Sequence, residues 1–184
     1  MRTATVCSMV AGFTVIAAPS AAWAAAIPVT TTEDSVVADG ETSLREAFTI
    51  ASGNGVGDTI VLGAGLTYVL DECAIGALAH TEAQALIVQG NASVIDQSCD
   101  ATAIIDSSAH AGSLHLQNLA IDGGPNAAAT GIEGAAIHSE SQLALSAVEI
   151  RNVLSPGGSA VWCAKCADSR TDLCIELRAP ARVK

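Results

Sequence analysis

The chain has 184 residues, half of them apolar, which is enough to build one domain with its own core. Its 8 lysines and arginines stand against 19 aspartates and glutamates. The formal net charge of −11 repels phosphate backbones and argues against nucleic-acid binding. Only 3% of the residues are aromatic, so the core must be filled by small aliphatic side chains, as suits a narrow and repetitive interior.

Residues 1–24 have the features of a signal peptide. Arg2 precedes an apolar run over 6–18, and Pro19 and the small-residue sequence Ala22-Trp23-Ala24 follow it. We expect cleavage after Ala24 and an exported product that is secreted, periplasmic or at the cell surface. The run is too short to span a membrane, so no transmembrane anchor is expected in the mature chain. The alternative, an apolar first strand, leaves the flanking charge and small residues unexplained.

Export permits disulfides, and the mature chain keeps an odd number of cysteines. Cys73 and Cys99 bracket one strand–turn–strand unit, so a disulfide between them would join adjacent turns of the chain, although spacing alone does not fix the pairing. Cys163, Cys166 and Cys174 resemble part of a zinc or redox motif. They lack a fourth ligand and a histidine at zinc spacing, so we predict no metal there.

A short helix is predicted over about 43–52. Ser43-Leu-Arg-Glu46 is a capping-box sequence, in which the Ser43 hydroxyl accepts from the Glu46 amide and the Glu46 carboxylate accepts from the Ser43 amide. We interpret Arg45 as an exposed charge on the helix surface. A helix this short is unstable alone in water, so its apolar stripe must lie on other apolar residues. The stripe consists of Leu44, Ala47, Phe48 and Ala51.

Short alternating segments surround this helix and repeat after it. An edge strand and an acidic loop are predicted over 27–39, and short strands over 58–62 and 68–70. Three later segments share one frame: Leu86–Asp96, Leu114–Asp122 and Leu143–Arg151. The last two fit L-x-L-x-x-[LV]-x-I at a spacing of 29 residues, and the first fits with a two-residue insertion. A weaker set covers 103–106, 134–138 and 158–162.

Each repeat is interpreted as one coil of a solenoid. Apolar side chains at period two point inward, and the intervening residues form a bend, where Asn118 suits the left-handed backbone of a sharp corner. Stacked coils pair their strands in parallel and bury an aliphatic column. The predicted fold is therefore all-β, a short parallel β-helix over 25–163, with the helix as its amino-terminal plug and Phe48 and Leu44 facing the column.

One family has similar residues at these places. Thr42-Ser-Leu-Arg-Glu-Ala47, with Gly57-Asp-Thr-Ile60 and Tyr68-Val-Leu70, resembles the CSLREA domain of exported bacterial right-handed parallel β-helix proteins. Gly134-Ala-Ala-Ile137 is similar to the repeat of polymorphic outer-membrane proteins, and Asn118-Leu-Ala-Ile121 to a corner of pectate-lyase-like helices. The resemblance covers about 27–163. It implies the fold and an exported location, but no reaction, since such proteins include adhesins, lyases and glycosidases. Thr42 replaces the family's cysteine, so that local disulfide is absent.

The candidate site residues are charged. Asp96 and Asp122 take the same place in successive coils, and Arg151 follows in the next, so they form either a cation or sugar site or an ordinary polar ladder at a solvent-facing corner, which we favour. His110, His115 and His138 are expected to point to solvent. No complete catalytic or metal-binding constellation is present, and no cofactor is predicted, although the acidity is compatible with Ca²⁺.

The expected function is a non-catalytic binding, adhesin-like or structural role of an exported protein, with a surface carbohydrate or protein as partner. The alternative is a polysaccharide lyase or glycoside hydrolase acting on acidic polysaccharide. After Trp162 the repeat stops, and 164–184 has no periodicity and a cationic bias, which we interpret as a truncated or divergent version of a longer β-helix protein. An open last coil would also permit self-association through its strand edges.

Overall fold

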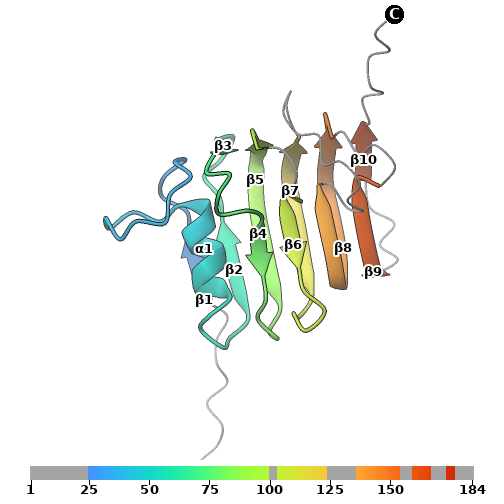
Figure 1. Ribbon diagram of the computed structural model, residues 1–184, viewed down its shortest axis with the longest axis horizontal. Coiled ribbons are helices and arrows are strands. Elements are labelled where there is room, and N and C mark those ends of the chain that lie inside the picture. The colour runs from blue at the N-terminus through green and yellow to red at the C-terminus, as the bar shows by residue number, and fades with distance from the viewer. Residues whose placement is uncertain (1–24, 100–102, 124–135, 154–158, 167–172, 177–184) are drawn as a thin grey trace, which may run out of the picture.

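A computed structural model describes residues 25–99, 103–123, 136–153, 159–166 and 173–176. One helix and ten strands form there, and all strand pairs are parallel (Figure 1). The helix is α1 (Leu44–Ala51). The strands are β1 (Ala25–Pro28), β2 (Asp58–Val61), β3 (Thr67–Leu70), β4 (Leu78–His80), β5 (Leu86–Gln97), β6 (Ile105–Ser107), β7 (Leu114–Asp122), β8 (Ile137–Arg151), β9 (Val161–Cys166) and β10 (Leu173–Glu176).

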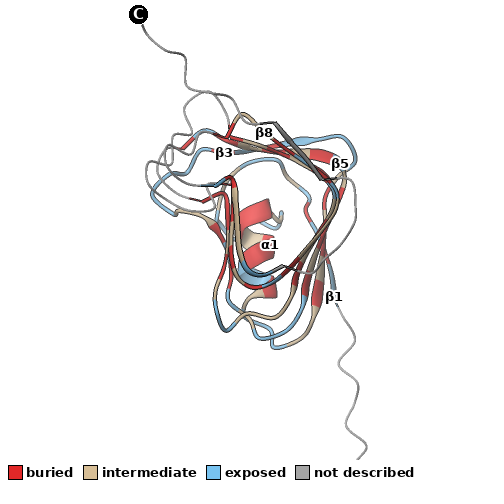
Figure 2. Ribbon diagram, turned by 90° about the vertical axis from the view of Figure 1, so that its right-hand side faces the viewer, coloured by how far each residue is buried: buried red, intermediate tan, exposed pale blue. Residues whose placement is uncertain are grey.

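The strands stack into three faces around one column, as the end-on view in Figure 2 shows. One face contains β1, β2 and the first parts of β5 and β7, with the middle of β8. A second contains β3, the last parts of β5, β7 and β8, and β10. The third contains β4, β6, the start of β8, and β9. The predicted short parallel β-helix is therefore confirmed.

The repeat alignment gives the strand register. Leu86 lies opposite Leu114, which lies opposite Leu143, and the isoleucines at the other ends of these strands stack in the same way. The predicted insertion is also present, because Gln89 pairs with Gln117 but the next pair is Ser93 with Leu119. The column of inward side chains is almost inaccessible to solvent. Burial of this apolar area stabilises the fold through the hydrophobic effect. Its members include Ile60, Val88, Leu116, Ile95, Ile121 and Ile150, each 0% exposed.

A left-handed residue marks the corner between the first two faces. Asn118 has φ +51°, as the sequence predicts, and Asn91 has φ +53° at the corresponding corner of β5. In β8 the corresponding residue is Ala147, with φ +52°. Alanine lacks the polar side chain that makes this conformation tolerable for asparagine, so this corner is strained.

Ala147→Asn is expected to raise the free energy of unfolding by up to about 1 kcal/mol, because asparagine accepts the left-handed backbone more readily. Ala147 is exposed, so the larger side chain meets no core. Chemical denaturation measures the gain. Ala144→Asn is the matched control, since Ala144 lies on the same strand without a positive φ and should give no gain. An equal effect of both substitutions would contradict the strain argument.

The helix closes the amino-terminal end of the column (Figures 1 and 2). Its capping box is present: the Ser43 hydroxyl accepts from the Glu46 amide at 3.1 Å, and the Glu46 carboxylate accepts from the Ser43 amide at 2.9 Å. All four residues of the predicted apolar stripe are buried, with Phe48 only 1% exposed. The helix contacts β4, β2 and β1, so it covers the open strands at that end.

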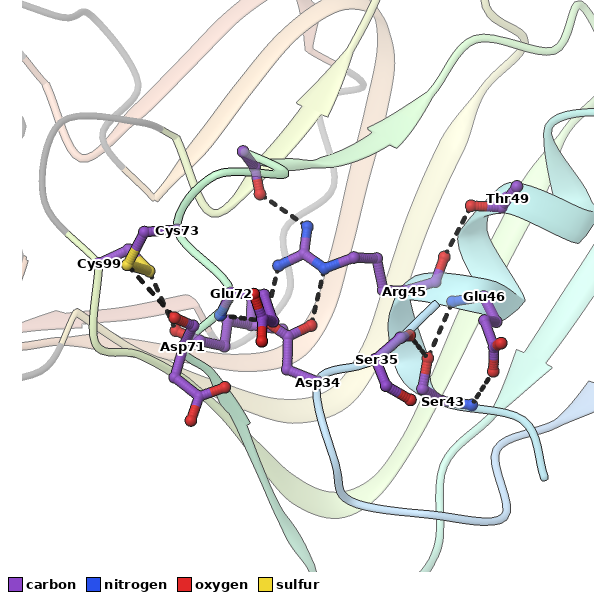
Figure 3. Close-up of polar contacts among 12 residues, drawn as sticks. Asp34, Ser35, Ser43, Arg45, Glu46, Thr49, Asp71, Glu72, Cys73 and Cys99 are labelled. Carbon is purple, nitrogen blue, oxygen red and sulfur yellow. Dashed lines mark hydrogen bonds and ion pairs between the residues drawn. A yellow bond between two sulfur atoms is a disulfide. The ribbon is translucent and has the colours of Figure 1, made fainter. Parts of the chain in front are cut away.

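Arg45 corrects one prediction, since it is buried rather than an exposed helix-surface charge. Its guanidinium pairs with the Asp34 carboxylate at 2.7 and 2.9 Å, and it donates to the Gly76 carbonyl at 2.7 Å (Figure 3). The Asp34 carboxylate also accepts from the Glu72 amide. Loops on both sides of the helix thus wrap the guanidinium, which gives the buried charge the partners it requires. The Arg45–Asp34 ion pair therefore joins α1, which is the plug of the β-helix, to the loop over 71–76.

Two further findings concern the cysteines and the carboxyl-terminal strands. Cys73 and Cys99 form the predicted disulfide, with a Cα–Cα distance of 5.2 Å. Cys163 is disulfide-bonded as well. The segment after 163, which has no repeat pattern, nevertheless contains strands, because β9 continues to Cys166 and β10 pairs with β8. Both short strands form by parallel pairing with β8, and Ile175 of β10 lies opposite Ile150. Their sequences do not fit the repeat.

Candidate functional site

Three charged residues form what we call the outer ladder: Asp96, Asp122 and Arg151. They pair in register across β5, β7 and β8, each directly after an inward isoleucine, as the sequence predicts. Their common position follows from the alternation of the strands, which turns the residue after a buried one outward. The ladder is therefore a column of charges on the face that contains β3 and β10.

Asp122 is the most fully engaged member of the outer ladder. Its Oδ2 accepts from Arg151 Nε at 2.8 Å, and its Oδ1 accepts from Asn152 Nδ2 at 2.9 Å. Arg151 also contacts the Glu149 carboxylate at 3.4 Å. The hydrogen bond with Asp122 is the main reason that the pKa of Arg151 lies above its usual value. Both oxygens of Asp122 thus serve the protein itself, which is the arrangement of a structural ion pair.

The pKa of the Asp96 carboxyl lies above its usual value. Burial raises the pKa of Asp96, the neighbouring Asp122 carboxylate raises it further, and Arg151 acts in the opposite direction. A carboxyl with a raised pKa can hold a proton at higher pH, which is a property of general acids. No hydrogen-bond geometry toward a second catalytic group accompanies it among the residues that the structure describes, so the shift by itself assigns no reaction.

A shallow groove of about 220 Å³ crosses three coils beside the outer ladder. Small side chains leave this space, and its polar residues are Ser93, Asn118 and Glu149. The groove is thus mildly acidic and open to solvent. Its lining consists of Ala92, Ser93, Asn118, Leu119, Ala120, Ala147 and Glu149.

A second column, which we call the aromatic row, lies on another face and consists of Asp106, His138 and Trp162. The three pair in register across β6, β8 and β9. His138 Nδ1 lies 2.8 Å from Asp106 Oδ1, and the imidazole stacks on the Trp162 ring with centroids 4.7 Å apart and 13° between the planes. The imidazole is therefore held on two sides.

The aromatic row was not among the predicted site residues. Sequence spacing pairs no histidine with a carboxylate, because Asp106 and His138 are 32 residues apart and meet only through the stacking of coils. The signal was the weaker repeat set, in which Asp106, His138 and Trp162 each close one segment. The other predicted histidines stand apart: His110 is exposed, and His115 Nδ1 lies 3.1 Å from Gln117 Nε2.

His80, which is not among the predicted site residues, is buried inside the third face. Its ring nitrogens contact the Ser107 hydroxyl at 3.2 Å and the Gln84 carbonyl at 3.1 Å, and Ser107 contacts Ser141 at 2.7 Å. Burial lowers the pKa of His80, although the bond to Gln84 and the charge of Glu82 oppose the shift. This buried polar network satisfies its own groups and joins three coils, which is a structural role.

No group of three or more His, Cys, Asp or Glu side chains in the described ranges is arranged to hold a metal ion. Within the same ranges, no helix is both long and apolar enough to cross a membrane. Comparisons with protein-family models, curated proteins and solved structures find no match to this chain. The resemblance to the CSLREA domain therefore stays a prediction.

Proposed function

We propose that this chain is an exported or cell-surface β-helix protein with a non-catalytic, adhesin-like role, which binds an extracellular carbohydrate or protein. One observation carries the proposal: both oxygens of Asp122 are engaged by Arg151 and Asn152. A catalytic base must be able to reach a substrate proton, and a carboxylate held in this way is poorly suited to it. The disulfides support export, since they persist in oxidising compartments.

The alternative is a polysaccharide lyase or glycoside hydrolase that acts on acidic polysaccharide. The raised pKa of Asp96 favours it, because an acid or base role requires a tuned carboxyl. The charge of the chain speaks against it. Asp96, Asp122 and Glu149 place three carboxylates with one arginine beside the groove, and such a surface repels a polyuronate.

An activity assay separates the two functions. The full chain is mixed with polygalacturonate and Ca²⁺, and the absorbance of unsaturated uronates is followed. We expect no rise above that of a sample without protein. A rise that is lost in Asp122→Ala or Asp96→Asn, but kept in the matched surface variant Glu82→Gln, would overturn the proposal and assign the ladder to catalysis. Reducing-end release is followed in parallel to detect hydrolysis.

A further inference from the structure

We propose that the aromatic row of Asp106, His138 and Trp162 binds a neutral sugar unit of an extracellular polysaccharide. This inference rests on the proposed binding function and names its ligand and its place. The site lies on the face formed by β6, β8 and β9, not in the groove beside the outer ladder.

Trp162 is the first reason. Among the described residues the other Phe, Tyr and Trp side chains are Phe48 and Tyr68, and both are core residues at 1% and 2% exposure. Trp162 instead is partly exposed, at an outward position in line with Asp106 and His138. A partly exposed indole has an apolar face with a polar edge, a combination that is enriched where proteins contact ligands. The C–H face of a pyranose ring is a fitting partner for it.

The hydrogen-bonding character of the row is the second reason. Asp106 accepts from His138 Nδ1, so in the neutral imidazole Nδ1 carries the proton and Nε2 is an acceptor. The Asp106 carboxylate, whose side chain is 47% exposed, offers acceptor sites as well. Beside the indole face, the row thus presents acceptors that require donors from the ligand. Sugar hydroxyls are such donors, whereas the carboxylates of a uronate are not.

The rigidity of the row is the third reason. The ladder of parallel strands sets the position of each residue, and the ring stack together with the 2.8 Å contact to Asp106 holds the imidazole. A ligand therefore meets side chains that are already ordered, and binding costs less conformational entropy than it would on mobile side chains. Ala79, which is exposed and precedes Asp106 in the same column, leaves room for the next part of the ligand.

The test uses the full chain with Trp23→Phe, so that Trp162 is the single tryptophan whether or not residues 1–24 are cleaved off. Neutral oligosaccharides of glucose, mannose, galactose and N-acetylglucosamine are titrated separately while its fluorescence is followed, with polygalacturonate as the acidic probe. We expect saturable quenching by at least one neutral oligosaccharide and none by polygalacturonate. Calorimetry on the chain without this substitution should show Trp162→Ala and Asp106→Asn weakening that binding by about tenfold or more.

The controls separate this inference from the proposed function. Trp162→Phe keeps an aromatic face and should retain most of the affinity, and Glu149→Gln in the groove should leave it unchanged. Melting temperatures equal to that of the parent show that the variants are folded. Binding that persists in Trp162→Ala and Asp106→Asn at parental strength, or that is lost in Glu149→Gln, would place the sugar elsewhere and refute the inference while the binding function stands. Binding of a surface protein but of no oligosaccharide would refute it too, and binding of neither would refute both.

Discussion

Phe48→Asp is expected to unfold or aggregate the protein. Phe48 is 1% exposed and belongs to the same buried cluster as Leu44, Ile60 and Leu62, so the substitution removes an aromatic side chain and buries a carboxylate without a partner. Either change alone costs several kcal/mol, and together they exceed about 5 kcal/mol, comparable to the whole stability of a small domain. Soluble yield and the thermal melting transition measure the loss.

The helix supplies its own control. Ile50 is 47% exposed on the same α1, so Ile50→Asp introduces the same charge in the same helix without entering the column. We expect Ile50→Asp to stay soluble and to melt close to the parent. A soluble Phe48→Asp variant with an unchanged melting transition would show that α1 is not the plug of the β-helix. Similar losses in both variants would instead point to the charge on the helix rather than to its position.

The repeat and the cap were predictable because both depend on local rules. The frame shared by 114–122 and 143–151 places inward residues at period two, and stacking then fixes which residues pair. The capping box needs only four consecutive residues, Ser43 to Glu46. The two-residue insertion in 86–97 was also predictable, because the residues before it and after it each keep the inward and outward alternation of the frame.

Contacts between segments without a pattern could not be predicted. Asp34 lies in an acidic loop that resembles any solvated loop, so nothing in the sequence showed that its carboxylate would meet Arg45. The aromatic row needs the register of β6, β8 and β9, and β8 pairs with β6 at only three residues and with β9 at only five. β10 was missed for a related reason, since its ladder partner β8 rather than its own sequence makes it a strand.

The second large effect is expected from Arg45→Met. The Asp34 side chain is 0% exposed and that of Arg45 is 5% exposed, so methionine would leave a buried carboxylate and the Gly76 carbonyl without their cationic donor. Removal of one partner from a buried ion pair costs about 3–5 kcal/mol, because the remaining charge stays out of water without compensation. The loss is measured by chemical denaturation at pH 7. Lys165→Met is the matched control, since Lys165 is exposed on β9, and it should change little.

The double variant Asp34→Leu with Arg45→Met shows whether charge or packing causes this loss. If the unpaired carboxylate is responsible, the double variant recovers most of the stability, because no buried charge remains. The recovery should also depend on pH. Burial alone would raise the pKa of Asp34, but the hydrogen bonds and charge of Arg45 and the Glu72 amide outweigh it, so the pKa is lowered.

A lowered pKa in the folded state means that the Asp34 contribution is complete above the unfolded-state value of about 3.9 and is lost as the pH falls through the folded-state value. We therefore expect the parent to lose stability below about pH 4 more steeply than the double variant does. Equal acid sensitivity of the two proteins, or no recovery in the double variant, would mean that Arg45 stabilises the plug through its packing and its bond to Gly76 rather than through Asp34.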